Sequence, residues 1–249
     1  MIGKSLIFAL ISAVAMYLVR MYFHTEAYLS DIGGIQTFFG VFGILYGIMA
    51  AFVVFEVWNQ YNETSGLIDK EAQGLERLYR LTLYFRDEKL TKEMLTMIKN
   101  YAQKVIEGKF QILGSGQRNV ENGKLFRKIA DVIREIKFDD EHDSIVYGKI
   151  LDHYGELGLT RTERQNKSLQ RLPVLLKYFI YVSSGLIMAV FVILPFANPV
   201  YGMLSTFGFG FVLAMVYQLI EDLDNPFVGN WNISPEPFER ALKHIEEDY

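Results

Sequence analysis

Four apolar stretches, each long enough to cross a bilayer as a helix, constrain the fold of this chain more than any other feature. A hydrocarbon core about 30 Å thick takes about 20 mostly apolar helical residues to span. The stretches run from near Ile2 to Tyr22, from about Thr37 to Trp58, from about Val174 to Phe196 and from about Tyr201 to Ile220. Aromatic side chains gather at their ends, as they do at membrane–water interfaces. The chain is therefore predicted to be a membrane protein with two pairs of spans, and the lipid bilayer is its first expected partner.

The first stretch has a second interpretation as a cleaved signal peptide. It has a basic residue near its start, and Ala13 and Ala15 have the spacing of a cleavage site. However, the apolar run continues through Val19 and stops only at Arg20. We therefore expect an uncleaved span.

The composition excludes several classes of function. The net charge is −4 and the pI is about 5.7, so the chain lacks a basic footprint and no nucleic acid partner is expected. It has no cysteine, which removes disulfides, thiolate metal sites and cysteine nucleophiles. The sequence contains no phosphate-binding loop, no Gly-x-Ser-x-Gly elbow and no His-Glu-x-x-His motif. We expect neither an enzyme nor a cofactor.

A polar block from Asn59 to Pro173 separates the two pairs of spans. Apolar residues recur in it at helical spacing, first in continuation of the second span and then over Leu90–Phe110, Lys124–Phe138 and Ser144–Leu157. No strand-like alternation is present, so the predicted fold class is all-α, with four or five amphipathic helices in the block. The expected domains are residues 1–58 with spans one and two, 59–173 as a cytosolic helical domain, 174–221 with spans three and four, and 222–249 as a cytosolic tail.

Basic residues predict the orientation of the spans. Arg161, Arg164, Lys167 and Arg171 come just before the third span, whereas the link 197–200 between spans three and four is uncharged. Positive residues favour the cytosolic side of a membrane. We expect the polar block and both termini to lie in the cytosol.

Two stretches carry a family resemblance. The first is Val57-Trp58-Asn59-Gln60-Tyr61-Asn62-Glu63, at the end of the second span. The second runs from Gln218 to Gly229 and contains Asp222-Leu223-Asp224-Asn225-Pro226-Phe227. Together with the two-plus-two spans, these resemble the bestrophin family. The second stretch, followed by Ile233-Ser234-Pro235-Glu236-Pro237-Phe238, is closest to the bacterial bestrophin-like proteins of unassigned function.

The resemblance implies a bestrophin-like homopentamer in the inner membrane that passes small ions, anions such as chloride in the family. It also implies a narrow apolar neck on the second span, near Gly40, Ile44 and Ile48. Apolar rings of this kind gate a pore by dewetting. The same span has a face of small residues, which has a second interpretation as helix packing within one subunit. That face consists of Gly40, Gly43, Gly47, Ala50 and Ala51.

Glu56, at the end of the second span, has two interpretations. Repeated by symmetry around a pore, its carboxylate would form a negative ring at the mouth that favours cations and repels anions. Alternatively, it pairs with a basic side chain at the interface. On an ideal helix it lies well away from the direction of Gly40 and Ile44, so only a widened mouth would expose it to the pore. The second span offers no basic ring in support of anion selectivity.

The chain departs from the family after the Asn-Pro-Phe motif. Eukaryotic bestrophins have acidic residues there that form a calcium clasp, whereas this chain has no carboxylate until Glu236. Its carboxylates precede the motif, at Glu221, Asp222 and Asp224. They have two interpretations, as a divalent-cation site with Asn225 or as structural groups that cap a turn or pair with arginines. We favour the structural role.

Two further expectations concern the tail and the acidic run at residues 139–143. Asn225-Pro226-Phe227 is predicted to form a clasp, a turn that docks the tail on the cytosolic helices. The acidic run lacks the alternating oxygen ligands of a calcium loop and is expected to be a solvated turn.

Three functions remain open from the sequence. The first is a bestrophin-like ion channel, and the second is a non-conducting membrane scaffold or sensor whose cytosolic helices bind a partner. The third, a metal-dependent membrane enzyme that uses the carboxylates at 221, 222 and 224, is the weakest, because no base or nucleophile accompanies them.

Overall fold

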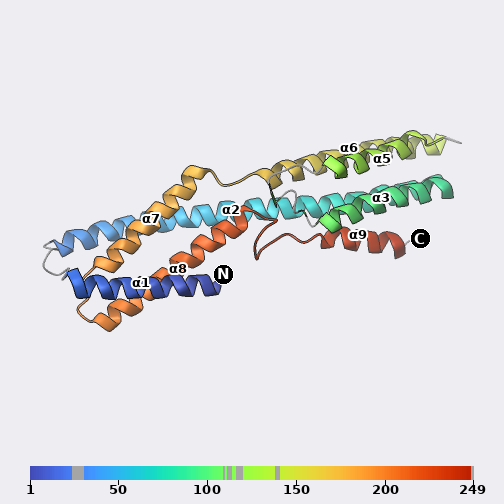
Figure 1. The fold of residues 1–249 in the computed structure, drawn as a ribbon. Coiled ribbons are helices and arrows are strands. Elements are labelled where there is room, and N and C mark those ends of the chain that lie inside the picture. The colour runs from blue at the N-terminus through green and yellow to red at the C-terminus, as the bar shows by residue number, and fades with distance from the viewer. Residues whose placement is uncertain (24–30, 109, 111–113, 116–119, 138–140, 248–249) are drawn as a thin grey trace. The chain divides into compact units, whose positions relative to one another are not determined.

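The computed structural model describes residues 1–23, 31–108, 110, 114–115, 120–137 and 141–247, and this part of the chain is helical without a strand (Figure 1). The helices are α1 (Ile2–Phe23), α2 (Ile32–Thr82), the short 3₁₀ helix η2 (Leu83–Phe85), α3 (Glu88–Gly108), α5 (Val120–Arg134), α6 (Glu141–Leu169), α7 (Val174–Ile193), α8 (Pro199–Asp224) and α9 (Glu236–Glu247). The all-α prediction is confirmed. Of the acidic run, residues 139 and 140 lie outside the described residues.

Four of the described helical segments are long and apolar enough to cross a membrane, which confirms the predicted spans. The observed helices differ from the predicted ranges mainly at their ends. α2 begins at Ile32 rather than near Thr37, and α6 runs to Leu169 rather than ending at Leu157. The continuation of α2 beyond the second span as one helix confirms the prediction. α9 falls in the predicted tail. Capping and tertiary contacts move helix ends in ways that apolar periodicity does not reveal.

The chain divides into two compact units. The membrane unit consists of residues 1–59 and 171–224, and the polar unit consists of residues 60–170 and 225–249. The first division falls inside α2, between Asn59 and Gln60. The tail after α8 therefore belongs to the same unit as the polar helices.

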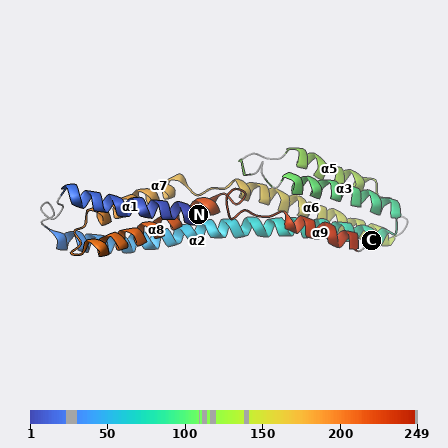
Figure 2. The same ribbon diagram turned by 60° about the horizontal axis from the view of Figure 1, so that its bottom comes forward.

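In the membrane unit, α1 lies antiparallel beside α8 (Figures 1 and 2). Small residues allow a close approach, because a Cβ added at Gly210 would lie 3.2 Å from the Ser12 Oγ. Polar bonds hold α1 at both of its ends, one to α8 and one to the link between α7 and α8. Gln218 donates to the Ser5 Oγ at 2.6 Å, and Arg20 donates to the Phe196 carbonyl.

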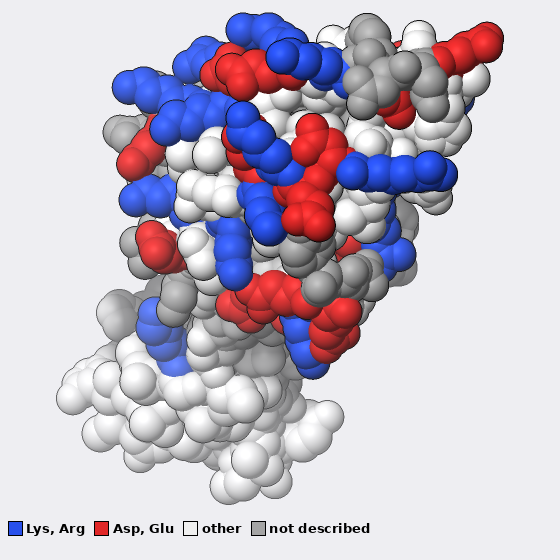
Figure 3. Space-filling model, turned by 90° about the vertical axis from the view of Figure 1, so that its right-hand side faces the viewer, with Lys and Arg blue, Asp and Glu red and all other residues white. Residues whose placement is uncertain are grey.

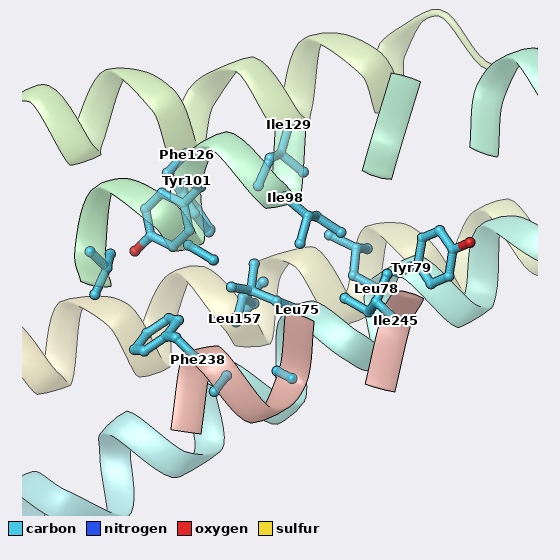
Figure 4. Close-up of a cluster of buried hydrophobic side chains, with 14 of the residues drawn as sticks. Leu75, Leu78, Tyr79, Ile98, Tyr101, Phe126, Ile129, Leu157, Phe238 and Ile245 are labelled. Atoms are coloured by element: carbon cyan, nitrogen blue, oxygen red, sulfur yellow. The ribbon is translucent and has the colours of Figure 1, made fainter. Parts of the chain in front are cut away.

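The polar unit has its own hydrophobic core, to which α2, α3, α5, α6 and α9 all contribute (Figure 4). The predicted stripe on the second half of α2 supplies Ile68, Leu75 and Leu78, each no more than 1% exposed. Asp87 starts α3, since its carboxylate accepts from the backbone N–H of Lys89 at 2.9 Å and that of Leu90 at 3.1 Å. On the surface of this unit, side chains of opposite charge lie next to one another (Figure 3).

Candidate functional site: the exposed face of α2 and the turn after α8

The membrane part of α2 has one buried face and one exposed face. Tyr46, Ala50, Val53 and Val57 are buried, at the three- and four-residue spacing of a single helix face. The Tyr46 hydroxyl lies 2.8 Å from the Ser184 Oγ of α7 and joins the two helices. This face is therefore the one that α2 uses inside its own chain.

The predicted neck residues lie on the exposed face. Ile44 is 66% exposed and Ile48 is 63% exposed, and Gly40 is exposed as well. A Cβ added at Gly40, Gly43 or Gly47 would meet no atom of the described chain within 4 Å, apart from the helix's own nearby backbone. These three glycines are therefore not needed for a close helix approach within the described part of a single chain, whereas Ala50 of the same small-residue face is buried in its own chain.

A groove separates part of this small-residue face from α7 and α8. Its volume is about 580 Å³. Gly43, Gly47 and Ala50 line it from α2, and Phe191 and Leu213 line it from α7 and α8. The lining is almost wholly apolar, which suits a surface that meets hydrocarbon or another apolar helix.

Glu56 is half-buried near the end of the membrane part of α2. It lies twelve positions after Ile44, a rotation of about 120° around an ideal helix. The side chain is therefore on a different face from the neck residues, as expected from the sequence.

Two of the three carboxylates of the predicted cation site already bind groups of the membrane unit. Asp224 is buried, and its carboxylate accepts from the Lys177 Nζ at 2.7 Å and from the Leu172 backbone N–H. Glu221 accepts from the Tyr181 hydroxyl and lies 3.4 Å from the Lys177 Nζ. Asp222 is half-buried.

The surroundings of these carboxylates favour a structural role over a cation site. Among the described residues, no group of three or more His, Cys, Asp or Glu side chains is placed to hold a metal ion. Lys177 and the Leu172 N–H occupy oxygens that a cation would need. The bonds of Asp224 and Glu221 instead join the start of α7 to the end of α8.

The turn after α8 packs inside the polar unit. The Asn225 side chain donates to the Gly114 carbonyl at 3.0 Å, and the Ile233 backbone N–H donates to the Pro226 carbonyl at 2.8 Å. Phe227 is buried, with its ring centroid 5.3 Å from that of Phe110. These contacts attach the tail to the segment that follows α3.

Gly114 and Phe110 were not singled out as partners of this turn. A Cβ at Gly114 would lie 2.9 Å from the Val228 Cγ2 and 3.3 Å from the Phe227 Cβ, so a larger residue there would force these side chains to move. In the sequence, this place carries only a Gly-Ser-Gly run, which is typical of a break between helices and does not identify a partner.

A buried ionic network was also missed. Glu71 of α2 is 0% exposed and Arg164 of α6 is 2% exposed; the Arg164 guanidinium donates to both Glu71 carboxylate oxygens. The Tyr101 hydroxyl donates to Glu71 and accepts from Arg161 at 3.2 Å. Arg164 had entered the sequence analysis only as one of the basic residues that orient the spans.

The environment of this network shifts the pKa of its phenol. Burial raises the pKa of Tyr101 above its ordinary value of 10.0, and the neighbouring Glu71 carboxylate raises it further. The charges of Arg164 and Arg161 act in the opposite direction but do not outweigh burial. Tyr101 is therefore a neutral donor throughout the physiological pH range.

Comparisons with known proteins agree with this fold. A scan against protein families matches residues 6–238 to the Bestrophin-like domain. A bacterial bestrophin homologue from Klebsiella pneumoniae carrying a point mutation matches with a TM-score of 0.71 and 11% identity, over 99% of this chain and 98% of that chain. A second structure of the homologue matches with a TM-score of 0.68 and 12% identity, over 100% and 97% of the two chains.

Another point mutant of the same homologue has a TM-score of 0.68 and 13% identity, over 99% of this chain and 96% of that chain. The comparison with curated proteins finds no match. Identities this low show a shared fold and nothing finer, but the family match extends over nearly the whole sequence. The chain is therefore a multi-pass membrane protein of the bestrophin-like family.

Proposed function

We propose that the chain forms an oligomeric ion channel in which α2 of each subunit lines an apolar neck. The observation that supports this proposal is the exposed face of α2, where Ile44 is 66% exposed, Ile48 is 63% exposed and a Cβ added at Gly40 would meet no described atom beyond its own helix backbone within 4 Å. Membership of the bestrophin-like family supports the same conclusion.

Symmetry would give this face its function. Gly40 allows neighbouring backbones to approach, and Ile44 and Ile48 would project rings of branched apolar side chains toward the axis. The family resemblance indicates five subunits. The apolar groove beside Gly43 and Gly47 supplies a further surface suited to a neighbouring helix of the assembly.

Two features bear on the ion selectivity of the proposed channel. The family resemblance indicates anions such as chloride, while Glu56 would place negative charge at the mouth of the neck. The proposed channel conducts anions, and a ring of Glu56 carboxylates at its mouth reduces the anion flux. The proposed location is the inner membrane, with the polar unit and both termini in the cytosol.

The test combines oligomeric state and flux for the full chain. We expect the detergent-purified protein to run as a symmetric oligomer and to pass ions when reconstituted in liposomes. Ile44→Ala and Ile48→Ala should each raise the flux, because a smaller side chain widens and wets the constriction. Ile7→Ala is the matched control, since Ile7 of α1 is 62% exposed but is not part of the proposed neck.

A monomeric protein without flux would refute the channel. If the wild type conducts and both α2 variants have unchanged flux, Ile44 and Ile48 do not form the constriction. If Ile7→Ala and Ile44→Ala change the flux equally, the change in flux is not specific to the neck.

A scaffold or sensor is the second candidate function, and one observation favours it. Ile145, Leu151 and Leu159 of α6 are 63%, 46% and 67% exposed, although they belong to the polar unit. Apolar side chains exposed to water on one helix suit a protein contact. A stoichiometric soluble partner, captured by the wild type but not by Leu159→Ser, together with no conductance in liposomes, would favour this function over the channel.

A further inference from the structure

A second groove in the membrane unit has a polar rim and an apolar floor. It lies between α1, α7 and α8 and has a volume of about 430 Å³. Phe8, Gly185 and Met188 form part of the floor, and Lys4 and Tyr217 are among the polar residues that line it. None of its lining residues belongs to the predicted neck.

The groove starts among residues that are typical of a membrane interface and extends along the apolar part of α7. Gln218 of α8 donates to Ser5 of α1, so the start of α1 lies beside the last turns of α8. Tyr181 and Tyr217 face each other there with ring centroids 4.8 Å apart, as aromatic residues do at the headgroup level. From Tyr181 to Met188 the groove follows α7 for about 10 Å, which suits the first part of an acyl chain.

The charges at this end leave one cation unpaired. Lys4 is exposed and has no ion pair among the described residues. The acidic groups nearby in the sequence of α8 are already engaged, because Glu221 binds Tyr181 and Lys177, and Asp224 binds Lys177 and the Leu172 N–H. The unpaired ammonium therefore favours a negatively charged ligand.

We propose that this groove binds an anionic phospholipid, with its phosphate on the Lys4 ammonium and one acyl chain on the floor formed by Phe8, Gly185 and Met188. The apolar floor selects a lipid over a soluble phosphate, since a soluble anion would leave that floor empty. Lys4 selects a lipid of net negative charge, because a zwitterionic headgroup would bring a second ammonium close to it.

Native mass spectrometry of the full-length protein in detergent tests the proposal. The probes are phosphatidylglycerol, phosphatidylcholine and glycerol 3-phosphate at matched concentrations. We expect phosphatidylglycerol to bind more tightly than phosphatidylcholine, and glycerol 3-phosphate not to bind. Lys4→Gln should weaken phosphatidylglycerol binding about fivefold, the effect of one lysine at an anionic membrane surface, and Lys4→Arg should retain it.

Gly185 provides a steric test of the floor. A Cβ there would meet no atom within 4 Å, so Gly185→Leu should fill the groove without disturbing the helices and should reduce binding of both phospholipids. Gly208→Leu is the matched control, since Gly208 has the same open surroundings but does not line the groove.

Four results would overturn the proposal. Equal affinity for the two phospholipids, or full phosphatidylglycerol binding by Lys4→Gln, would show that the Lys4 charge does not select the lipid. Unchanged binding by Gly185→Leu would place the acyl chain elsewhere. Binding of glycerol 3-phosphate as tight as that of the lipid would show a site for soluble phosphate.

Discussion

Glu71 and Arg164 show what a pair of charges requires in the interior of a protein. Both side chains are buried from water, so each depends on the other and on Tyr101 for the interactions that water would otherwise supply. Glu63 and Lys167 join the same two helices at 2.6 Å, but their side chains are 54% and 37% exposed. The two ion pairs should therefore differ strongly in their effect on stability.

We expect Glu71→Leu or Arg164→Leu to lower the stability of the polar unit by about 3 kcal/mol, because each leaves a buried charge without a partner. Glu63→Gln, the exposed counterpart, should cost less than about 1 kcal/mol. Urea unfolding of the purified protein, followed by tryptophan fluorescence, measures the difference. The double variant Glu71→Leu, Arg164→Leu should lose less than the sum of the two single changes, and an additive loss would contradict the pairing.

The raised pKa of Tyr101 predicts a loss of stability at alkaline pH. Below a pH of about 10, the phenol is protonated in both the folded and the unfolded chain, so its contribution is complete. As the pH rises further toward the folded-state pKa, only the unfolded chain releases the proton, and the folded state loses that contribution. The free energy of unfolding, measured between pH 8 and about pH 11, should fall less steeply with pH in Tyr101→Phe than in the wild type.

Tyr154→Phe provides the comparison at a second phenol. Burial raises the pKa of Tyr154 as well, so its removal should also flatten the decline. If neither variant changes how the free energy of unfolding falls with pH, the loss of stability at alkaline pH comes from other titratable groups.

At the scale of helices, α2 and α9 use their faces in different ways. The polar part of α2 buries one apolar stripe in the core, while its membrane part leaves a stripe exposed. α9 buries Phe238, Ala241 and Ile245 from a single face. Ion pairs from α9 to α2 and α3 surround this face, including Arg240 with Asp69 at 3.3 Å and Lys99 with Glu246 at 2.5 Å.

Phe238→Ala should release α9 from the polar unit. The side chain is 0% exposed, and its loss should cost about 3–5 kcal/mol, more than the exposed ion pairs of the helix contribute. Hydrogen–deuterium exchange of the α9 amides should accelerate strongly, while exchange in α1 and α8 should stay unchanged. Glu239→Ala, an exposed change on the same helix, is the control and should leave protection intact.

At the scale of the whole molecule, a symmetric oligomer would place one copy of each side chain per subunit around the same axis, so the effect of a single residue on ions would be repeated. One Glu56 carboxylate has little effect on ions in bulk water, but a symmetric ring of these carboxylates at the widened mouth of the neck would change the electrostatic energy of an entering ion more than a single one does. The net charge of each chain is −4, so no excess of positive charge offsets such a ring.

Glu56→Gln should therefore increase the permeability of chloride relative to potassium. The measurement is the reversal potential of the reconstituted protein under a potassium chloride gradient. Glu63→Gln is the control, because Glu63 lies in the polar unit and is paired with Lys167. An unchanged reversal potential in Glu56→Gln would place Glu56 outside the ion pathway.

The four spans and the helical nature of the polar block follow from the sequence alone. Both depend on hydrophobicity and its period, which are local properties of about 20 consecutive residues. The apolar stripe that includes Ile68, Leu75 and Leu78 is buried, as its helical spacing predicted. The family resemblance also belongs to this level, because it rests on the short motifs at Trp58 and Asn225.

Only the tertiary structure decided which of these residues meet. Glu71 and Arg164 are separated by 93 positions, and Asn225 and Gly114 by 111, so no local pattern pairs them. The exposure of Ile44 and of the glycines on α2 likewise depends on where α7 and α8 lie. Hydrophobic periodicity determines that a helix has an apolar face, but long-range packing determines which part of that face stays open to a ligand, a lipid or another subunit.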